Sequence, residues 1–300
     1  NDLQPCTATA SFFAYARNNL VICCRHNSLE IQRVFEGHSA KVDLLVADAH
    51  KGYSASEIIF SYDGSKVGIC WDLLTGREKV QFVTREVLTA AIWLNNRKIA
   101  LGFATGMLSL FELSSAKHVS TKTIDSSISA LSTALDGNKF AIGYHDGTIL
   151  IANLAPRFTI LNQLSMPNVA SPIVSLSWHR SFTILAGQNG RGDLCCWHTK
   201  FDPPKLVRRF KPLVKTTPGT NWMGWSKNGR IVQFFSARAP LALRDVRTKR
   251  TKCKAVPMPE IIKGLAIYSP GAMLFVLGAK HTIQQIKLEP NLELVATVQN

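Results

Sequence analysis

A short turn recurs at a nearly constant interval along the 300 residues of this chain. Each copy is followed by side chains that alternate between apolar and polar, a pattern typical of a half-buried β-strand. The turns, separated by 45, 42, 41, 45, 47 and 42 residues, are at Asn19, Gly64, Gly106, Gly147, Gly192, Ala239 and His281. Because unrelated turns would be spaced irregularly, the interval predicts seven copies of one structural unit.

Each unit holds short apolar runs separated by turn residues, which favours a four-stranded meander over a helix. The predicted units are residues 1–38, 39–83, 84–124, 125–165, 166–212, 213–257 and 258–300. An isolated meander exposes both faces, whereas radial packing of several meanders buries them. The predicted fold class is therefore all-β: a seven-bladed β-propeller of four-stranded antiparallel blades, with residues 1–300 as a single domain. The irregular first unit, whose last strand is predicted at 29–32, and the apolar run 292–298 fit a ring closed by pairing strands from the two chain ends.

Residues 35–83 form the clearest copy of the unit. Gly37-His38 opens it, Ser61-Tyr62-Asp63-Gly64 lies near its centre and Trp71-Asp72 closes it. This order of motifs resembles the WD-repeat family of β-propellers, whose repeats are about 40–45 residues long. The resemblance implies a hydrogen-bonded network inside the second blade, made of His38, Ser61, Asp63 and Trp71.

The copies also depart from the family pattern. Gly64 and Trp71 are two residues further apart than is usual, which favours an incomplete network. At the Trp-Asp position, the fourth unit has Ala152-Asn153, the fifth has Trp197-His198 and the sixth has Arg244-Asp245. The resemblance therefore covers the whole chain as architecture, with one strong copy.

Few residues favour catalysis. A His-Ser-Asp set could form a hydrolase triad, but His38, Ser61 and Asp63 fall where a blade needs internal hydrogen bonds, so a structural role is favoured. The sequence has no phosphate-binding Gly-x-x-x-x-Gly-Lys motif, no His-Glu-x-x-His motif and no Gly-x-Ser-x-Gly motif. The scattered histidines do not recur at ligand spacing. We therefore predict no catalytic residue, metal, cofactor or small-molecule substrate.

The positive charge of the chain is concentrated in one region. Residues 200–254 carry fifteen basic and two acidic side chains, which accounts for +13 of the net charge of +15. The candidate patch for a polyanion or a partner consists of Arg208, Arg209, Lys211, Lys215, Arg247, Lys249, Arg250, Lys252 and Lys254. Four interpretations stay open: a solvated face, phosphates of RNA or DNA, an acidic protein surface, and phosphoinositide headgroups. The last is the weakest, because Arg208-Arg209 is followed by Phe210 and not by the Gly of the lipid-binding Arg-Arg-Gly motif.

These patterns predict a non-enzymatic interaction scaffold, a propeller subunit of an intracellular multiprotein assembly. The alternative is a nucleic-acid-associated propeller of a ribonucleoprotein particle that contacts phosphates through the basic patch. A third and weaker hypothesis is a hydrolase or isomerase that uses the central channel.

The cysteine pattern indicates the compartment. The seven cysteines are odd in number and show no Cys-x-x-Cys spacing, which favours a reducing, intracellular location, cytoplasm or nucleus. No apolar run reaches the roughly 18 residues of a membrane span, and no signal peptide is visible. The missing initiator Met favours a segment of a longer protein.

Overall fold

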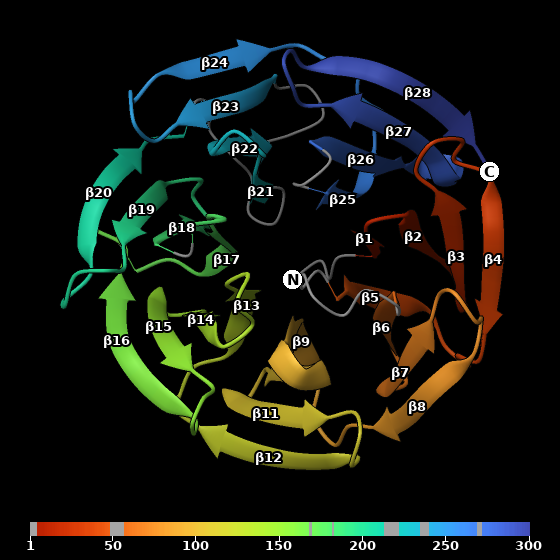
Figure 1. The fold of residues 1–300 in the computed structure, drawn as a ribbon, viewed down its shortest axis with the longest axis horizontal. Helices are drawn as coiled ribbons and strands as arrows, with labels where there is room; N and C mark the ends of the chain where they lie inside the picture. The colour runs from red at the N-terminus through yellow and green to blue at the C-terminus, as the bar shows by residue number, and fades with distance from the viewer. Residues whose placement is uncertain are drawn as a thin grey trace. The chain divides into compact units, whose positions relative to one another are not determined.

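We describe a computed structural model of the chain, which covers residues 5–48, 57–167, 170–181, 183–212, 222–234, 240–268 and 272–300. In this described part, twenty-eight strands form seven sheets of four strands each. The strands of every sheet are consecutive in the sequence, and neighbouring strands such as β1 and β2 or β27 and β28 pair antiparallel. The predicted fold class, a seven-bladed β-propeller of four-stranded blades, is confirmed (Figure 1).

The chain divides into two compact units, which are described separately. The first unit, residues 88–253, holds blades three to six. Its strands are β9 Leu88–Leu94, β10 Lys98–Phe103, β11 Met107–Glu112, β12 Lys117–Lys122, β13 Ile128–Thr133, β14 Lys139–Tyr144, β15 Thr148–Asn153, β16 Thr159–Ser165, β17 Ile173–Trp178, β18 Ile184–Asn189, β19 Leu194–His198, β20 Lys205–Phe210, β21 Trp222–Trp225, β22 Arg230–Phe234, β23 Leu241–Asp245 and β24 Thr251–Lys254, whose last residue belongs to the second unit.

The second unit, residues 2–87 and 254–300, holds blades one, two and seven. Its strands are β1 Cys6–Ala8, β2 Phe12–Arg17, β3 Leu20–Arg25, β4 Ile31–Glu36, β5 Val42–Ala47, β6 Ile58–Asp63, β7 Val67–Asp72, β8 Glu78–Val83, β25 Ile262–Tyr268, β26 Met273–Gly278, β27 Thr282–Lys287 and β28 Glu293–Gln299. Among the described residues, the helical segments are two single 3-10 turns, η1 Asn95–Arg97 and η3 Ala279–His281.

Six of the seven predicted turns lie between the second and third strands of a blade; Ala239 lies outside the described residues. One predicted strand has the wrong bounds, and the closure of the ring, which the sequence left open, does not use a sheet shared by the two chain ends. The last strand of blade one is 31–36 and not 29–32. The two chain ends do not share a sheet, because β1 to β4 form one sheet and β25 to β28 another, with the 292–298 run as β28. The end of the chain instead reaches blade one through a side-chain hydrogen bond from Asn300 Nδ2 to the carbonyl of Leu29, 3.2 Å long.

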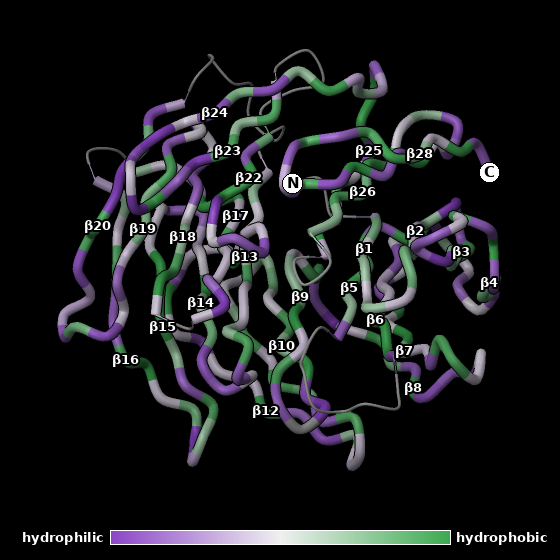
Figure 2. Tube along the Cα trace, turned by 45° about the horizontal axis from the view of Figure 1, so that its top comes forward, coloured by the Kyte–Doolittle hydropathy of each residue, from purple (hydrophilic) through white to green (hydrophobic). Residues whose placement is uncertain are grey.

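The core lies between the faces of neighbouring blades within each unit. The middle strands are buried on both faces, as in β6, where all six residues are buried, while the fourth strands are largely exposed. Figure 2 colours the chain by hydropathy, and the apolar first strand β9 is mostly green in it. In the second unit, Phe13 of blade one stacks on Phe275 of blade seven with ring centroids 5.0 Å apart. Burial of apolar faces, which contributes roughly 25 cal/mol per Å², thus holds neighbouring sheets together.

A β-bulge recurs where the fourth strand pairs with the third. Five blades have this register shift, among them blade two at Cys70/Trp71, blade four at Ile151/Ala152 and blade five at Cys196/Trp197. A bulge places two residues of one strand opposite one residue of its partner and bends the strand. It changes which side chains of the fourth strand face solvent.

Candidate functional site

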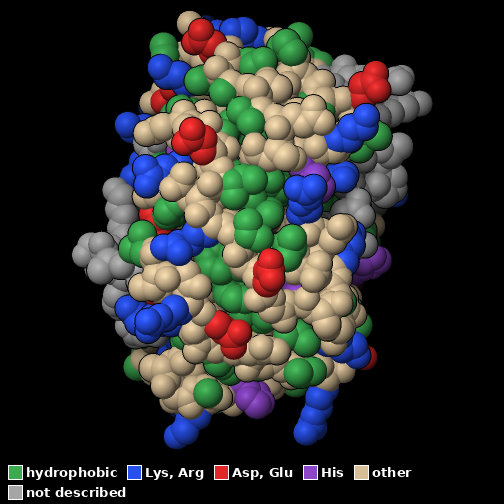
Figure 3. Space-filling view, turned by 90° about the vertical axis from the view of Figure 1, so that its right-hand side faces the viewer, with side chains coloured by type: hydrophobic (Ala, Val, Ile, Leu, Met, Phe, Trp, Pro, Cys, Tyr) green, Lys and Arg blue, Asp and Glu red, His purple; other side chains and the backbone are tan. Residues whose placement is uncertain are grey.

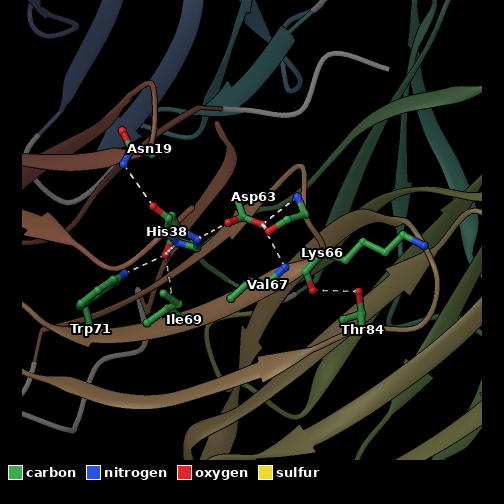
Figure 4. A network of polar contacts seen from close by, with 10 residues as sticks. Asn19, His38, Asp63, Lys66, Val67, Ile69, Trp71 and Thr84 are labelled. Atoms are coloured by element: carbon green, nitrogen blue, oxygen red, sulfur yellow. Dashed lines mark hydrogen bonds and ion pairs between the residues drawn. The ribbon is translucent and has the colours of Figure 1, made fainter. Parts of the chain in front are cut away.

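Four polar side chains of blade two lie in one chain of hydrogen bonds (Figure 4). His38 Nδ1 lies 2.9 Å from Asp63 Oδ2, and His38 Nε2 lies 2.6 Å from Ser61 Oγ. Trp71 Nε1 donates to the same Ser61 Oγ at 2.7 Å. The structure therefore brings together the four residues that the resemblance singled out, and the longer spacing from Gly64 to Trp71 does not interrupt the contacts.

Local structure places each member of the chain. Ser61 and Asp63 are two residues apart on β6, so both side chains point to the same face of the sheet. Trp71 is on β7 opposite Ile59, and His38 is in the connection that precedes β5. The other carboxylate oxygen of Asp63 accepts hydrogen bonds from the backbone N–H groups of Ser65 and Val67, both 3.0 Å long, which fixes the turn between β6 and β7.

Burial and hydrogen bonds together set the protonation states of His38 and Asp63. Burial lowers the pKa of His38 below its ordinary value, and the hydrogen bond and charge of Asp63 only partly oppose this effect. For Asp63, burial raises the pKa, but hydrogen bonds from Ser65, Val67 and His38 outweigh it and hold the pKa below its ordinary value. The ionised carboxylate therefore accepts a hydrogen bond from the N–H group at His38 Nδ1, and neutral His38 Nε2 accepts a hydrogen bond from the hydroxyl of Ser61.

The arrangement leaves no polar atom for a substrate. Ser61 and Asp63 are fully buried and His38 is 4% exposed. Both ring nitrogens of His38 are engaged, and Ser61 Oγ is shared between His38 and Trp71. A nucleophile has to reach the substrate with its oxygen exposed, so this His-Ser-Asp set does not have the accessibility of a hydrolase triad.

The lowered pKa of His38 predicts a pH dependence of stability. Between its folded pKa and its ordinary value of 6.5, the unfolded chain binds a proton that the folded chain does not. The stability that neutral His38 contributes is therefore complete above pH 6.5 and is lost as the pH falls toward the folded pKa. Urea unfolding between pH 7.5 and 5 should show a steeper loss for the wild type than for His38→Gln, by up to about 1.4 kcal/mol per pH unit. Parallel pH profiles of the two proteins would contradict this assignment.

In other blades, the positions equivalent to those of the blade-two network hold different side chains. In blade five, Asn189 replaces Asp63, and its Oδ1 accepts the N–H groups of Arg191 and Asp193, both at 3.0 Å. In blade six, the register places Gln233 and Arg244 where blade two has Ser61 and Trp71. Sequence reasoning found Arg244 at the Trp position but did not identify its partners.

Arg244 is buried and central to blade six. Its guanidinium donates to Gln233 Oε1 at 3.1 Å, to Thr251 Oγ1 at 2.8 Å and to the Lys211 carbonyl at 2.9 Å. It also lies over the ring of Phe210, 5.2 Å from the centroid. One of the fifteen cations of residues 200–254 is thus a packing residue, and its charge does not reach the surface.

The structure does not place the candidate patch on one uniform surface. Arg208 is half-buried and donates to the backbone carbonyl of Arg247 at 2.8 Å, which joins β20 to the turn between β23 and β24. Arg209 pairs with Asp193 at 3.5 Å. Lys254 is in the other compact unit, where it donates to the Leu292 carbonyl. Lys215 lies outside the described residues.

The exposed remainder of the patch is concentrated at the β23–β24 turn. Arg247, Lys249 and Arg250 are exposed in this turn, and Lys252 is exposed on β24. Arg247 Nε is 4.0 Å from Asp245 Oδ1, whose carboxylate also caps the N–H groups of Arg247 and Thr248. Lys211 is exposed in the connection from β20 to β21, at the opposite end of β20 from Lys205. Among the described residues of the predicted patch, the turn thus holds the densest group of exposed cations.

The surface also has exposed apolar side chains that sequence reasoning missed. Ile160 and Leu161 on β16, Phe201 in the β19–β20 connection and Leu206 on β20 are all more than one-third exposed. A signal was present: β16, with the sequence TILNQLS, is a fourth strand without a charged residue. Figure 3 shows one face of the molecule, on which apolar side chains gather between charged ones. In the other compact unit, Ile31 and Val34 are exposed apolar side chains on the fourth strand β4.

The described residues contain no group of three or more His, Cys, Asp or Glu side chains placed to hold a metal ion. None of their helices has the length and apolar character needed to span a membrane.

Comparison with known proteins identifies the fold. No protein-family model and no curated protein matches the sequence. Among solved structures, the β-propeller domain of Cps50 (Swd1) from Myceliophteria thermophila is similar, with 15% sequence identity and a TM-score of 0.76. The match covers 94% of this chain and 94% of that chain. The match shows that the chain has a β-propeller fold, as the sequence predicts.

Proposed function

We propose that the protein is a non-enzymatic scaffold whose blades hold binding surfaces for other proteins of an intracellular assembly. The observation that carries this proposal is where the polar side chains of the protein lie. His38, Ser61 and Asp63, whose side chains are of the types used in catalysis, are buried and hydrogen-bonded in one network. The exposed surface instead carries cations and apolar side chains that do not take part in this network. In this view the blade-two network, with Trp71, braces its sheet, and residues 1–300 act as one domain.

The cysteines support the intracellular part of the proposal. All seven are free thiols, and all but Cys253 are buried. Burial raises the pKa of Cys24 to about 11 and that of Cys195 to about 12, so these side chains stay protonated and behave as small apolar groups.

Affinity purification from the cell of origin tests the scaffold proposal. The tagged protein should recover a reproducible set of proteins in fixed ratios, and nuclease treatment should not release them. The Trp71→Ala variant serves as a control for binding by misfolded chains, because its partners should be chaperones. Recovery of the wild-type protein without stoichiometric partners would overturn the proposal.

A second candidate function, contact with nucleic-acid phosphates, is favoured by the β23–β24 turn. Arg247, Lys249 and Arg250 lie within four consecutive residues, and all three are exposed. Neighbouring cations of this kind attract a polyanion at long range. Such contacts would be independent of base sequence, because they address the backbone alone.

The charge-reversal variant Arg247→Glu/Lys249→Glu/Arg250→Glu tests this second candidate. If each cation neutralises one phosphate, the affinity of the wild type for a labelled uridine oligonucleotide should fall with salt with a log–log slope of about −2. The variant should lose this binding while its circular dichroism stays unchanged. Lys117→Glu on β12 is the matched control, since Lys117 is exposed on a fourth strand away from the turn. Equal binding by the wild type and the triple variant would remove the candidate.

A further inference from the structure

Four exposed apolar side chains lie on adjoining elements of blades four and five. Their exposed fractions are 38% for Ile160, 44% for Leu161, 54% for Phe201 and 41% for Leu206. In Figure 1, β16 and β20, which carry three of them, follow each other along the outer side of these two blades. We call this set the blade 4/5 apolar surface.

The backbone of blade four creates the first half of the surface. Ile151 pairs with Asn162 and Ala152 pairs with Ile160, so Leu161 is the extra residue of a bulge. Strand alternation would turn one of two successive side chains inward, but the bulge leaves both Ile160 and Leu161 exposed. The strand offers an uncharged edge seven residues long, of a kind that proteins commonly protect with charges or proline.

The β19–β20 connection brings the second half alongside. Asn162 Nδ2 donates to Asp202 Oδ1 at 3.2 Å, which joins β16 to the residue that follows Phe201. The Phe201 ring contacts the ring of His198, with centroids 5.1 Å apart. His198 in turn pairs with Lys205, and Trp197 pairs with Leu206. One hydrogen bond between the two blades therefore joins β16, which carries Ile160 and Leu161, to the connection that carries Phe201 and leads into β20.

The charge around this surface has one dominant sign. Three exposed cations each lie within five positions, along the sequence, of one of the apolar side chains: Arg157, Lys200 and Lys205. In the described part of the chain, none of these three cations makes an ion pair. The nearby acid, Asp202, already accepts the hydrogen bond from Asn162.

We propose that the blade 4/5 apolar surface binds an extended acidic segment of a partner protein. The segment adds along the free edge of β16, its apolar side chains cover Ile160, Leu161 and Phe201, and its carboxylates face Arg157, Lys200 and Lys205. Strand addition suits an exposed sheet edge, because backbone hydrogen bonds supply affinity and alternate side chains supply specificity. This inference rests on the proposed scaffold function and names the partner chemistry for one of its surfaces.

The composition of the surface favours protein over nucleic acid. Three of the four apolar side chains are aliphatic, and aliphatic groups provide no stacking platform for bases. Single-strand binders align several aromatic side chains along a basic groove, whereas Phe201 is the one exposed Phe, Tyr or Trp among the described residues.

Selection from a phage library of random dodecapeptides tests the proposal with the intact chain. The library is panned on the wild-type protein after depletion on Leu161→Ser/Phe201→Ser, and enriched peptides are measured by fluorescence anisotropy. We expect peptides that combine Asp or Glu with bulky apolar residues. Leu161→Ser/Phe201→Ser and Lys200→Glu/Lys205→Glu should each weaken them by about tenfold or more. Val119→Ser, in which a 69% exposed residue of β12 is changed, should bind like the wild type.

Other outcomes overturn the inference. The first is that no enriched peptide class binds the wild type better than Leu161→Ser/Phe201→Ser. The second is enrichment of basic peptides. The third is that a uridine oligonucleotide competes with the peptides and that this competition requires Phe201. Unchanged circular dichroism of both double variants shows that a loss of binding is local. If no peptide class emerges while affinity purification still recovers stoichiometric partners, this surface assignment fails and the scaffold function stands. Failure of the purification itself counts against the scaffold.

Discussion

Replacing Trp71 with alanine is expected to lower the free energy of unfolding by about 3–5 kcal/mol, the range for removing a large buried aromatic side chain. Trp71 is 4% exposed, and its ring lies 5.0 Å from that of Phe35 in the neighbouring blade. Its loss would leave a cavity between blades one and two and remove the hydrogen bond to Ser61 Oγ. Urea unfolding, followed by circular dichroism and tryptophan fluorescence, measures the change.

The Trp71→Phe variant separates the two causes. It keeps most of the ring but cannot donate to Ser61, so it should cost about 1–3 kcal/mol, the range for leaving a buried polar group without its partner. Val119→Ser, on the exposed face of β12, should change the free energy of unfolding by less than about 0.5 kcal/mol. If Trp71→Ala were no more disruptive than Val119→Ser, the network would not brace the blade.

Replacing Arg244 with alanine is expected to cost a similar amount, about 3–5 kcal/mol, as for other buried groups whose removal leaves their partners unsatisfied. The change would leave the Gln233 side chain and the Lys211 carbonyl without this donor and would uncover the ring of Phe210. Burial lowers the pKa of Arg244, so the protein holds this cation in place at an energetic cost that its hydrogen bonds must offset.

The Arg244→Lys variant tests whether geometry or charge matters at this position. Lysine keeps the charge, but a single ammonium group cannot reproduce the planar fork that reaches three acceptors in different directions. We expect Arg244→Lys to recover less than half of the loss caused by alanine, measured by the same unfolding experiment. Wild-type stability of the lysine variant would show that the position requires only a positive charge.

The sequence was sufficient to predict the fold because its architecture is repetitive. The turn interval placed the blades, so that the predicted unit 125–165 holds β13 to β16 and the predicted unit 258–300 holds β25 to β28. The join between the chain ends could not be predicted, because strand exchange depends on pairing between distant segments, which alternation within one strand does not encode. Residues 29–32 were mispredicted because Leu29 has a positive φ of 55°, a turn conformation that its apolar character concealed.

The surfaces were harder to predict than the fold. A count of charges cannot show that Arg208 donates to the Arg247 carbonyl or that Arg244 is buried. Both features depend on which strands lie next to each other in the fold. Likewise, Leu161 and Phe201 lie forty positions apart, and the exposure of Leu161 in a bulge of β16 and the hydrogen bond between the neighbouring residues Asn162 and Asp202 are tertiary features. Contacts between blades depend on tertiary packing, and the spacing of residues within one repeat does not reveal that packing.

The scaffold proposal is tested most directly by the mass of the native particle that contains this chain. Sedimentation of the tagged protein from a nuclease-treated extract of its own cells should show it in a complex heavier than one chain. Leu161→Ser/Phe201→Ser should release at least one partner from that complex, and Val119→Ser should release none. Sedimentation of the wild-type protein as a free single chain in that extract would contradict the account.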